Sequence, residues 1–240
     1  MRITILGSSH GVPEPHRRCS CAMIQVGDRY YFVDMGMNPI DDLRTRQIPV
    51  EAVKGVFITH THGDHVNGLV GFADLVNWYF KTADPVMLLP EQDVIDLLKQ
   101  WLPAVNHASM RDLRFACYKE GVIYDDGVLK VTAIRTQHIA VSYAFLLEAE
   151  GRKVLFTGDL HHGRPTDFPE IAYSTHLDMV FCESAHFPVT EYKPIFAKCD
   201  IGKVCIQHYS PRFDSLLRGF IEDMKPLAVV IANDGAEFDI

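Results

Sequence analysis

The chain has 240 residues, enough to bury a substantial core, and we expect residues 1–240 to form a single domain. Hydrophobic residues make up 48% and charged residues 22%, a globular composition that argues against disorder. The formal net charge of -8 disfavours binding to long nucleic acids. The sequence shows no secretory signal and no stretch long enough to span a membrane. Its six cysteines are scattered along the chain. We therefore expect a cytoplasmic protein with reduced thiols and no membrane partner.

Short strand-like runs alternate with helix-like stretches along the chain. The expected strands are residues 3–6, 22–26, 30–33, 53–58, 86–89, 128–134, 143–147, 154–156, 179–182, 204–206 and 228–231. The expected helices are residues 68–80, 92–101, 191–198 and 213–224. The last of these helices carries an apolar face, expected to pack into the core, made of Leu216, Leu217 and Phe220. Residues 118–127 are expected to connect the two halves. Strand runs followed by helices, twice, predict an α/β four-layer αββα sandwich.

Three histidines and one aspartate directly follow the strand-like run that ends at residue 58. Alternate side chains of extended backbone share a side, so His60 and His62 can bind one ion. Gly63 permits a sharp turn, after which Asp64 and His65 begin the next helix and can face a second ion. Imidazole and carboxylate ligands at this spacing suit zinc, with manganese or iron as alternatives.

Further ligands are needed, because four residues cannot complete two coordination spheres. His138, Asp159 and His208 each follow an expected strand, at a place where a rigid scaffold gives way to a loop. The sequence therefore predicts two adjacent divalent ions, with zinc as the expected metal.

The complete pattern resembles the metallo-β-lactamase superfamily over nearly the whole chain, because a His-x-His-x-Asp-His motif is followed in order by a lone His, a lone Asp and a lone His. The runs FVDMG at 32–36 and TGD at 157–159 extend the resemblance. It implies that one ion is bound by His60, His62 and His138, the other by Asp64, His65 and His208, with Asp159 bridging them. It also implies the metallo-β-lactamase fold, with Asp34 as a buried residue behind the ligands.

Within that superfamily the chain most resembles the phosphodiesterase and tRNA 3′-end-processing (tRNase Z-like) branch, on the runs at 5–13, 18–20 and 207–212. Two features depart from it. Only residues 139–158 separate His138 from Asp159, which leaves no room for a tRNA-gripping arm, and VTEYK at 189–193 replaces the Gly-His motif expected before the last ligand. We therefore predict hydrolysis of a small phosphodiester, such as a cyclic nucleotide-like or sugar phosphate diester. The alternatives are a lactonase or thioesterase on the same site and a metal-binding protein without catalysis.

Two adjacent ions can lower the pKa of a shared water and polarise a substrate oxygen, which is the chemistry of hydrolysis. The leaving group needs a proton, and a histidine near the metals is the usual donor. We predict that His186 is this donor and that Glu183 orients it, with Asp64 completing the catalytic set. The alternative is that His186 and Glu183 are surface or structural residues.

Other polar residues carry weaker predictions. Arg212 either contacts a substrate phosphate or pairs with an acidic neighbour. His161 and His162 are expected in a solvated loop. Cys19 and Cys21 are expected to be buried or strand-lining thiols, because no second close pair of ligands lies near them in the sequence. The sequence leaves the oligomeric state open, and a homodimer is one candidate.

Overall fold

Two seven-stranded sheets make up the centre of the computed structural model, which describes residues 1–106 and 111–240. In spatial order, the first sheet contains β14 (Glu237–Asp239), β1 (Arg2–Gly7), β2 (Cys21–Val26), β3 (Arg29–Val33), β4 (Val53–Phe57), β5 (Val86–Leu89) and β6 (Phe115–Cys117). The second contains β13 (Ala228–Ile231), β12 (Ile201–Tyr209), β11 (Leu177–Ser184), β10 (Arg152–Phe156), β9 (Tyr143–Ala149), β8 (Lys130–Arg135) and β7 (Gly121–Asp125).

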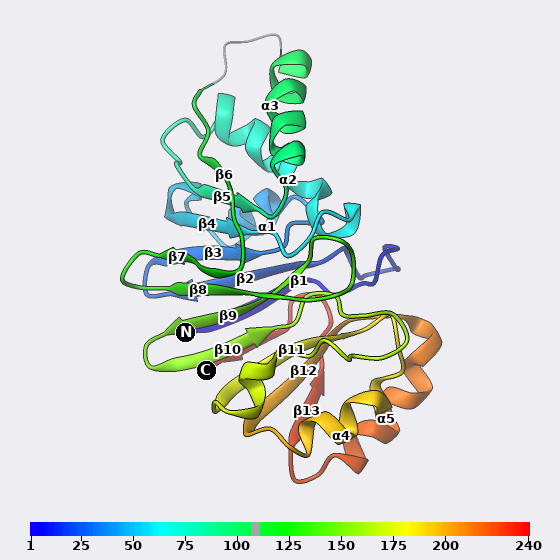
Figure 1. Cartoon of the computed structure of the whole chain (residues 1–240). Coiled ribbons are helices and arrows are strands. Elements are labelled where there is room, and N and C mark those ends of the chain that lie inside the picture. Colours follow the sequence, from blue (N-terminus) through cyan, green and yellow to red (C-terminus); the bar gives the residue numbers. More distant parts are fainter. Residues whose placement is uncertain (107–110) are drawn as a thin grey trace.

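Helices cover the outer face of each sheet (Figure 1). The first sheet carries α1 (Ile40–Thr45), α2 (Gly63–Trp78) and α3 (Gln92–Asn106), and the second carries α4 (Lys193–Phe196) and α5 (Asp214–Asp223). The apolar face of α2 repeats at helical spacing, with Leu69, Phe72 and Val76 fully buried against the first sheet. The predicted four-layer αββα sandwich is confirmed.

Aromatic side chains fill the space between the two sheets. Tyr31 and Phe57 of the first sheet face Phe145, Phe156 and Phe181 of the second, and all five are buried. The rings of Phe156 and Phe181 stack with centroids 4.5 Å apart. Truncating one such buried ring typically costs about 3–5 kcal/mol, so this layer is a rigid support for the loops at the strand ends.

The carboxyl ends of several strands meet at one edge of the sandwich. Strands β3 and β4 are parallel, and so are β10, β11 and β12. Strand β8 runs antiparallel to β9, which runs antiparallel to β10, so β8 also ends at this edge. The segments that follow β4, β8 and β10, together with the end of β12, hold the residues predicted to bind metal.

Some short elements were not predicted. Residues 118–127, expected to be a connection, contain the edge strand β7, whose side chains are half-exposed and give little alternation of apolar and polar residues. Elements α1, β6 and β14 span only three to six residues each, too few for a periodic pattern.

The expected helix at 191–198 is a 3-10 turn (Val189–Tyr192) followed by the single turn of α4. Leu216 is 41% exposed, whereas Leu217 and Phe220 are buried as expected.

Within the described ranges, none of the helices has both the length and the apolar character needed to cross a membrane. The organisation of the chain as a single domain stays a prediction.

Candidate metal centre

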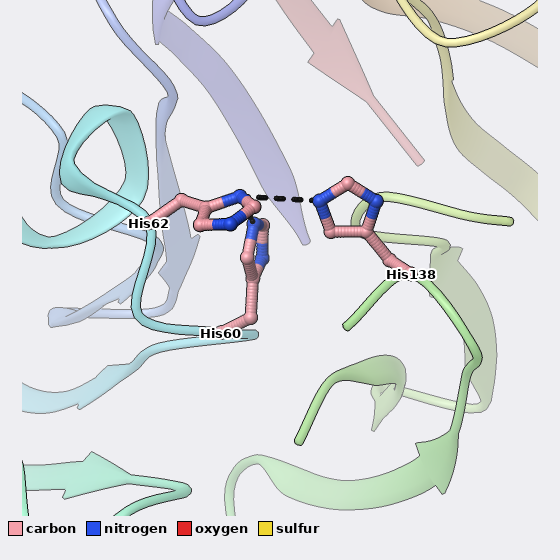
Figure 2. Close-up of side chains that lie close together, drawn as sticks. All are labelled: His60, His62 and His138. Carbon is pink, nitrogen blue, oxygen red and sulfur yellow. Dashed lines mark hydrogen bonds between the residues drawn. The ribbon is translucent and has the colours of Figure 1, made fainter. Parts of the chain in front are cut away.

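Three histidine nitrogens converge on one point (Figure 2). Nδ1 of His62 lies 3.2 Å from Nε2 of His60 and 3.1 Å from Nε2 of His138. His60 and His62 come from the segment after β4, and His138 comes from the segment after β8. Nδ1 of His60 has Thr59 Oγ1 at 3.1 Å, and Nδ1 of His138 has the Leu160 carbonyl at 3.3 Å. With these oxygens accepting the Nδ1 protons, the Nε2 lone pairs are free to bind a cation.

A second group of potential ligands lies beside the first. Helix α2 begins at Gly63, so Asp64 and His65 lie in its first turn, as predicted. Oδ2 of Asp64 is 3.3 Å from Nε2 of His65 and 3.8 Å from Nε2 of His208. His208 lies inside β12 rather than after it, at a bulge where β12 has one extra residue relative to β11. Its φ of 47° is left-handed, a conformation that costs free energy and is typical of functional sites.

Asp159 lies between the two groups and is only 3% exposed. Its Oδ2 is 3.7 Å from Nε2 of both His60 and His138 and 3.4 Å from Nε2 of His208. Its Oδ1 is 3.5 Å from Nε2 of His65. One carboxylate thus faces both groups, which is the geometry of a bridging ligand.

The residues fit divalent cations. Nε2 of His65 and Oδ1 of Asp159 are buried and have no hydrogen-bond partner among the described residues. An unsatisfied buried polar atom costs about 1–3 kcal/mol, and a bound cation removes that cost at both atoms. Burial, together with the nearby His65, holds the pKa of His60 well below its usual value. Burial and the neighbouring histidines lower the pKa of His138 to about 4, so both imidazoles are neutral, as metal binding requires.

Asp34 supports the centre from behind. It is buried, with a φ of 58°, and its carboxylate accepts hydrogen bonds from the backbone N of Thr59 (2.8 Å) and from Nδ1 of His65 (2.8 Å). Burial lowers the pKa of His65, but the charges of Asp159 and Asp34 outweigh it and raise that pKa well above its usual value in the metal-free chain. Asp34 therefore lies where the resemblance placed it, next to a predicted ligand and not among the converging atoms.

Glu183 and His186 lie beside the centre. Glu183 is 1% exposed, and its Oε2 accepts a 2.7 Å hydrogen bond from Nδ1 of His186. The His186 ring lies 4.5 Å from the His138 ring, and the His186 side chain is 16% exposed. A partly accessible imidazole held by a buried carboxylate has the arrangement that a proton donor needs.

The weaker predictions have mixed outcomes. His161 and His162 are exposed, but the His162 ring lies 4.3 Å from the His186 ring and so belongs to the rim of the centre. Arg212 donates a hydrogen bond to the carbonyl of Ala185, the residue before His186, and has no acidic partner among the described residues. Cys21 is buried in β2 and Cys19 is half-buried, as expected.

Sequence reasoning missed Ser20, which contacts a predicted ligand directly. Oγ of Ser20 lies 2.8 Å from Nδ1 of His208, although 188 residues separate them in the sequence. A lone serine carries no local signal of such a contact, so only the fold reveals it.

The chain is similar to known proteins in sequence and in fold. The family model described as "Anti-Pycsar protein Apyc1" matches residues 1–193. The chain belongs to the Apyc1 family. This Apyc1-family chain is also 23% identical over 220 residues to a ribonuclease Z of Crocosphaera subtropica, a match that covers 77% of the chain and 70% of the relative.

Two solved structures share the fold of this Apyc1-family chain. The metallo-β-lactamase fold protein YhfI of Bacillus subtilis has a TM-score of 0.78 at 18% identity and covers 99% of the chain and 98% of its own length. Human tRNase Z, short form, has a TM-score of 0.76 at 19% identity and covers 100% of the chain and 99% of its own length. The predicted metallo-β-lactamase-fold hydrolase, near the tRNA 3′-end-processing enzymes, is confirmed.

Proposed function

We propose that the chain is a phosphodiesterase that uses two divalent ions to hydrolyse a small phosphodiester. The observation that carries this proposal is the convergence of two groups of ligand atoms on either side of Asp159. His60, His62 and His138 would hold one ion, Asp64, His65 and His208 the other, and Asp159 would bridge them. Two such ions, when bound, supply a water of lowered pKa and neutralise the charge on a phosphate oxygen.

The chain's own residues would bind the substrate and move a proton. His186, oriented by Glu183, would donate a proton to the leaving oxygen of the substrate. The exposed ring of His162 lies next to His186 and would contact the substrate at the rim. Asp64, at the start of α2, is close to both His65 and His208 and keeps this part of the centre negatively charged: burial opposes ionisation, but His65 and His208 hold its pKa below the usual range.

The short path from His138 to Asp159 supports a small substrate. Strands β9 and β10 form a hairpin closed by the turn at Glu150 and Gly151, and they account for most of this path. None of residues 139–158 forms an arm that could grip a folded RNA. The relative from Crocosphaera subtropica is a ribonuclease by name, so cleavage of a phosphodiester is the chemistry that the two proteins would share, on substrates of different size.

We further propose that the ions are zinc and that the protein works in the cytoplasm. The zinc proposal is supported by five imidazoles and two carboxylates among the proposed ligands, a donor set that suits this ion. The location is supported by the unpaired state of all six cysteines.

A substrate panel tests the proposed function. Metal-free protein would be reloaded with zinc, manganese or iron, quantified for metal, and assayed against bis(p-nitrophenyl) phosphate, a 3′,5′-cyclic mononucleotide, a lactone and a thioester. We expect metal-dependent cleavage of the two phosphodiesters and its loss in Asp159→Ala. Activity on the lactone or thioester alone would overturn the phosphodiesterase proposal.

A further inference from the structure

Asp167 joins two loops of the centre. Its Oδ2 accepts a 2.6 Å hydrogen bond from the backbone N of Gln137, and its Oδ1 accepts a 2.9 Å bond from the backbone N of His161. Gln137 directly precedes His138, and His161 lies two residues after Asp159. One carboxylate therefore fixes the spacing between the loop of a histidine ligand and the loop of the bridging aspartate.

The core holds Asp167 itself in place. The next residue, Phe168, is 4% exposed, and its ring lies 6.0 Å from the ring of Tyr192 and 5.9 Å from that of Phe196. Pro165 and Pro169, on either side, are also buried. Hydrogen bonds from N–H groups to a carboxylate are stronger than neutral ones, so Asp167 is a firm link between the two loops and the core under the second sheet.

The link acts on the orientation of the His138 ring. Nδ1 of His138 donates to the carbonyl of Leu160, and this bond spans the same two loops that Asp167 joins. At 3.3 Å that hydrogen bond is long. The backbone N–H groups of Gln137 and His161 donate to the Asp167 carboxylate, and these bonds hold the segments on both sides of it. Without Asp167 the two loops could separate, and the His138 ring would lose its fixed direction.

The other group of ligands has different supports. Nδ1 of His65 is hydrogen-bonded to the carboxylate of Asp34, and Nδ1 of His208 is hydrogen-bonded to the hydroxyl of Ser20. Within the part of the chain that the structure describes, neither Asp34 nor Ser20 is hydrogen-bonded to Asp167. Losing Asp167 should therefore affect the two ions unequally.

We propose that Asp167 is a positioning residue that sets the affinity of the ion held by His60, His62 and His138. This inference rests on the two-ion site of the proposed function. It concerns metal binding, so its test does not depend on which substrate the enzyme cleaves.

Zinc binding to the full chain, measured by calorimetry in two backgrounds, tests the inference. His208→Ala removes a ligand of the ion next to α2, and His60→Ala removes a ligand of the other ion. Adding Asp167→Ala should weaken the remaining zinc about tenfold or more in the His208→Ala background. It should weaken the zinc much less in the His60→Ala background, because His65 and His208 there are still held by Asp34 and Ser20. Asp167→Asn keeps one acceptor oxygen and should give a smaller loss.

Asp178→Ala is the matched control. The Asp178 carboxylate also accepts a 2.8 Å hydrogen bond from a backbone N, that of Lys153, and a 2.7 Å hydrogen bond from the Arg152 side chain. These bonds lie at the end of β10 that is opposite to Asp159. Asp178→Ala should leave zinc affinity unchanged in both backgrounds. Thermal unfolding of the metal-free variants would check that each of them folds.

Two results would overturn the role of Asp167: equal weakening in both backgrounds, or no weakening in the His208→Ala background. A wild-type chain that binds a single zinc would overturn this inference and the two-ion site together. A chain that shows the expected binding pattern but cleaves no phosphodiester would overturn the proposed function alone.

Discussion

Nδ1 of His186 donates a 2.7 Å hydrogen bond to Oε2 of Glu183. Because the carboxylate accepts the Nδ1 proton, Nε2 is the ring nitrogen left to exchange a proton with a substrate. Burial lowers the pKa of His186, but the hydrogen bond and charge of Glu183 outweigh it and raise that pKa above its usual value. Glu183 thus favours the protonated, acid form of His186.

Replacing His186 should slow hydrolysis in a way that depends on the leaving group. With an alkyl phosphodiester, His186→Ala should lower kcat about 10²–10⁴-fold, the usual contribution of a general acid. With bis(p-nitrophenyl) phosphate the loss should be much smaller, because p-nitrophenolate leaves without a proton. Steady-state rates with both substrates, at equal metal content, check this. The same loss with both substrates would argue that His186 only supports the fold.

Replacing Glu183 should move the pH profile. The acid form of His186 exists below its pKa, and Glu183 raises that pKa, so activity should fall on the alkaline side as pH rises through the raised value. Glu183→Gln removes the charge and should shift this alkaline limb to lower pH. The measurement is kcat for an alkyl phosphodiester as a function of pH. If the alkaline limb of a folded, metal-loaded Glu183→Gln variant stayed at the same pH, the proposed action of Glu183 on His186 would be contradicted.

Asp126 should couple stability to acid pH. It accepts hydrogen bonds from Arg29 and from the Tyr31 hydroxyl on β3 of the first sheet, and from the backbone N of Leu129 near β8 of the second, so it links the two sheets. Burial opposes ionisation of Asp126, but the hydrogen bonds from the Leu129 N–H and the Tyr31 hydroxyl outweigh it and lower its pKa to about 2.

The sign of this effect follows from linkage. A depressed carboxyl pKa stabilises the fold above the unfolded value of about 3.9, and this stabilisation is lost as pH falls toward the folded value. Metal-free Asp126→Asn should therefore melt below the wild type at neutral pH, and the gap should close on acidification through this range. Thermal unfolding across that pH range measures it, and a gap that does not change with pH would refute the linkage.

Two glycines should respond oppositely to alanine. A Cβ on Gly36 would lie 1.7 Å from the carbonyl O of Asp64, in the first turn of α2, so Gly36→Ala must displace the turn that carries Asp64 and His65. Gly219, in α5, has nothing within 4 Å of its Cβ position, so Gly219→Ala should stabilise the protein by about 0.5–1 kcal/mol. Denaturant unfolding and metal content distinguish the two. A Gly36→Ala protein with wild-type stability and metal content would contradict this account of the close approach.

Much of the fold and of the candidate centre could be predicted because the signals are local. His60, His62, Asp64 and His65 lie within six residues, and each of the later predicted ligands lies at or near the end of an apolar strand. The αββα layering followed from the order of strands and helices. Edge strands such as β7 and β14 were missed because they are short and half-exposed.

Two supporting contacts could not be predicted, because the fold alone creates them. Ser20 meets His208 across 188 residues, and Asp167 meets Gln137 across 30 residues. The sequence around Ser20 and Asp167 gives no sign of either contact. His162 was expected to be solvated for the same reason, although its ring lies against His186.

A zinc titration of activity tests the central claim most directly. Metal-free protein would receive increasing zinc while cleavage of bis(p-nitrophenyl) phosphate is followed, with Asp159→Ala in parallel. The two-ion site predicts activity that rises until both ions are bound and then levels off, and an Asp159→Ala protein that stays inactive throughout. Cleavage that persists in the chelated protein, or that is the same in Asp159→Ala, would contradict the claim that this chain is a two-metal phosphodiesterase.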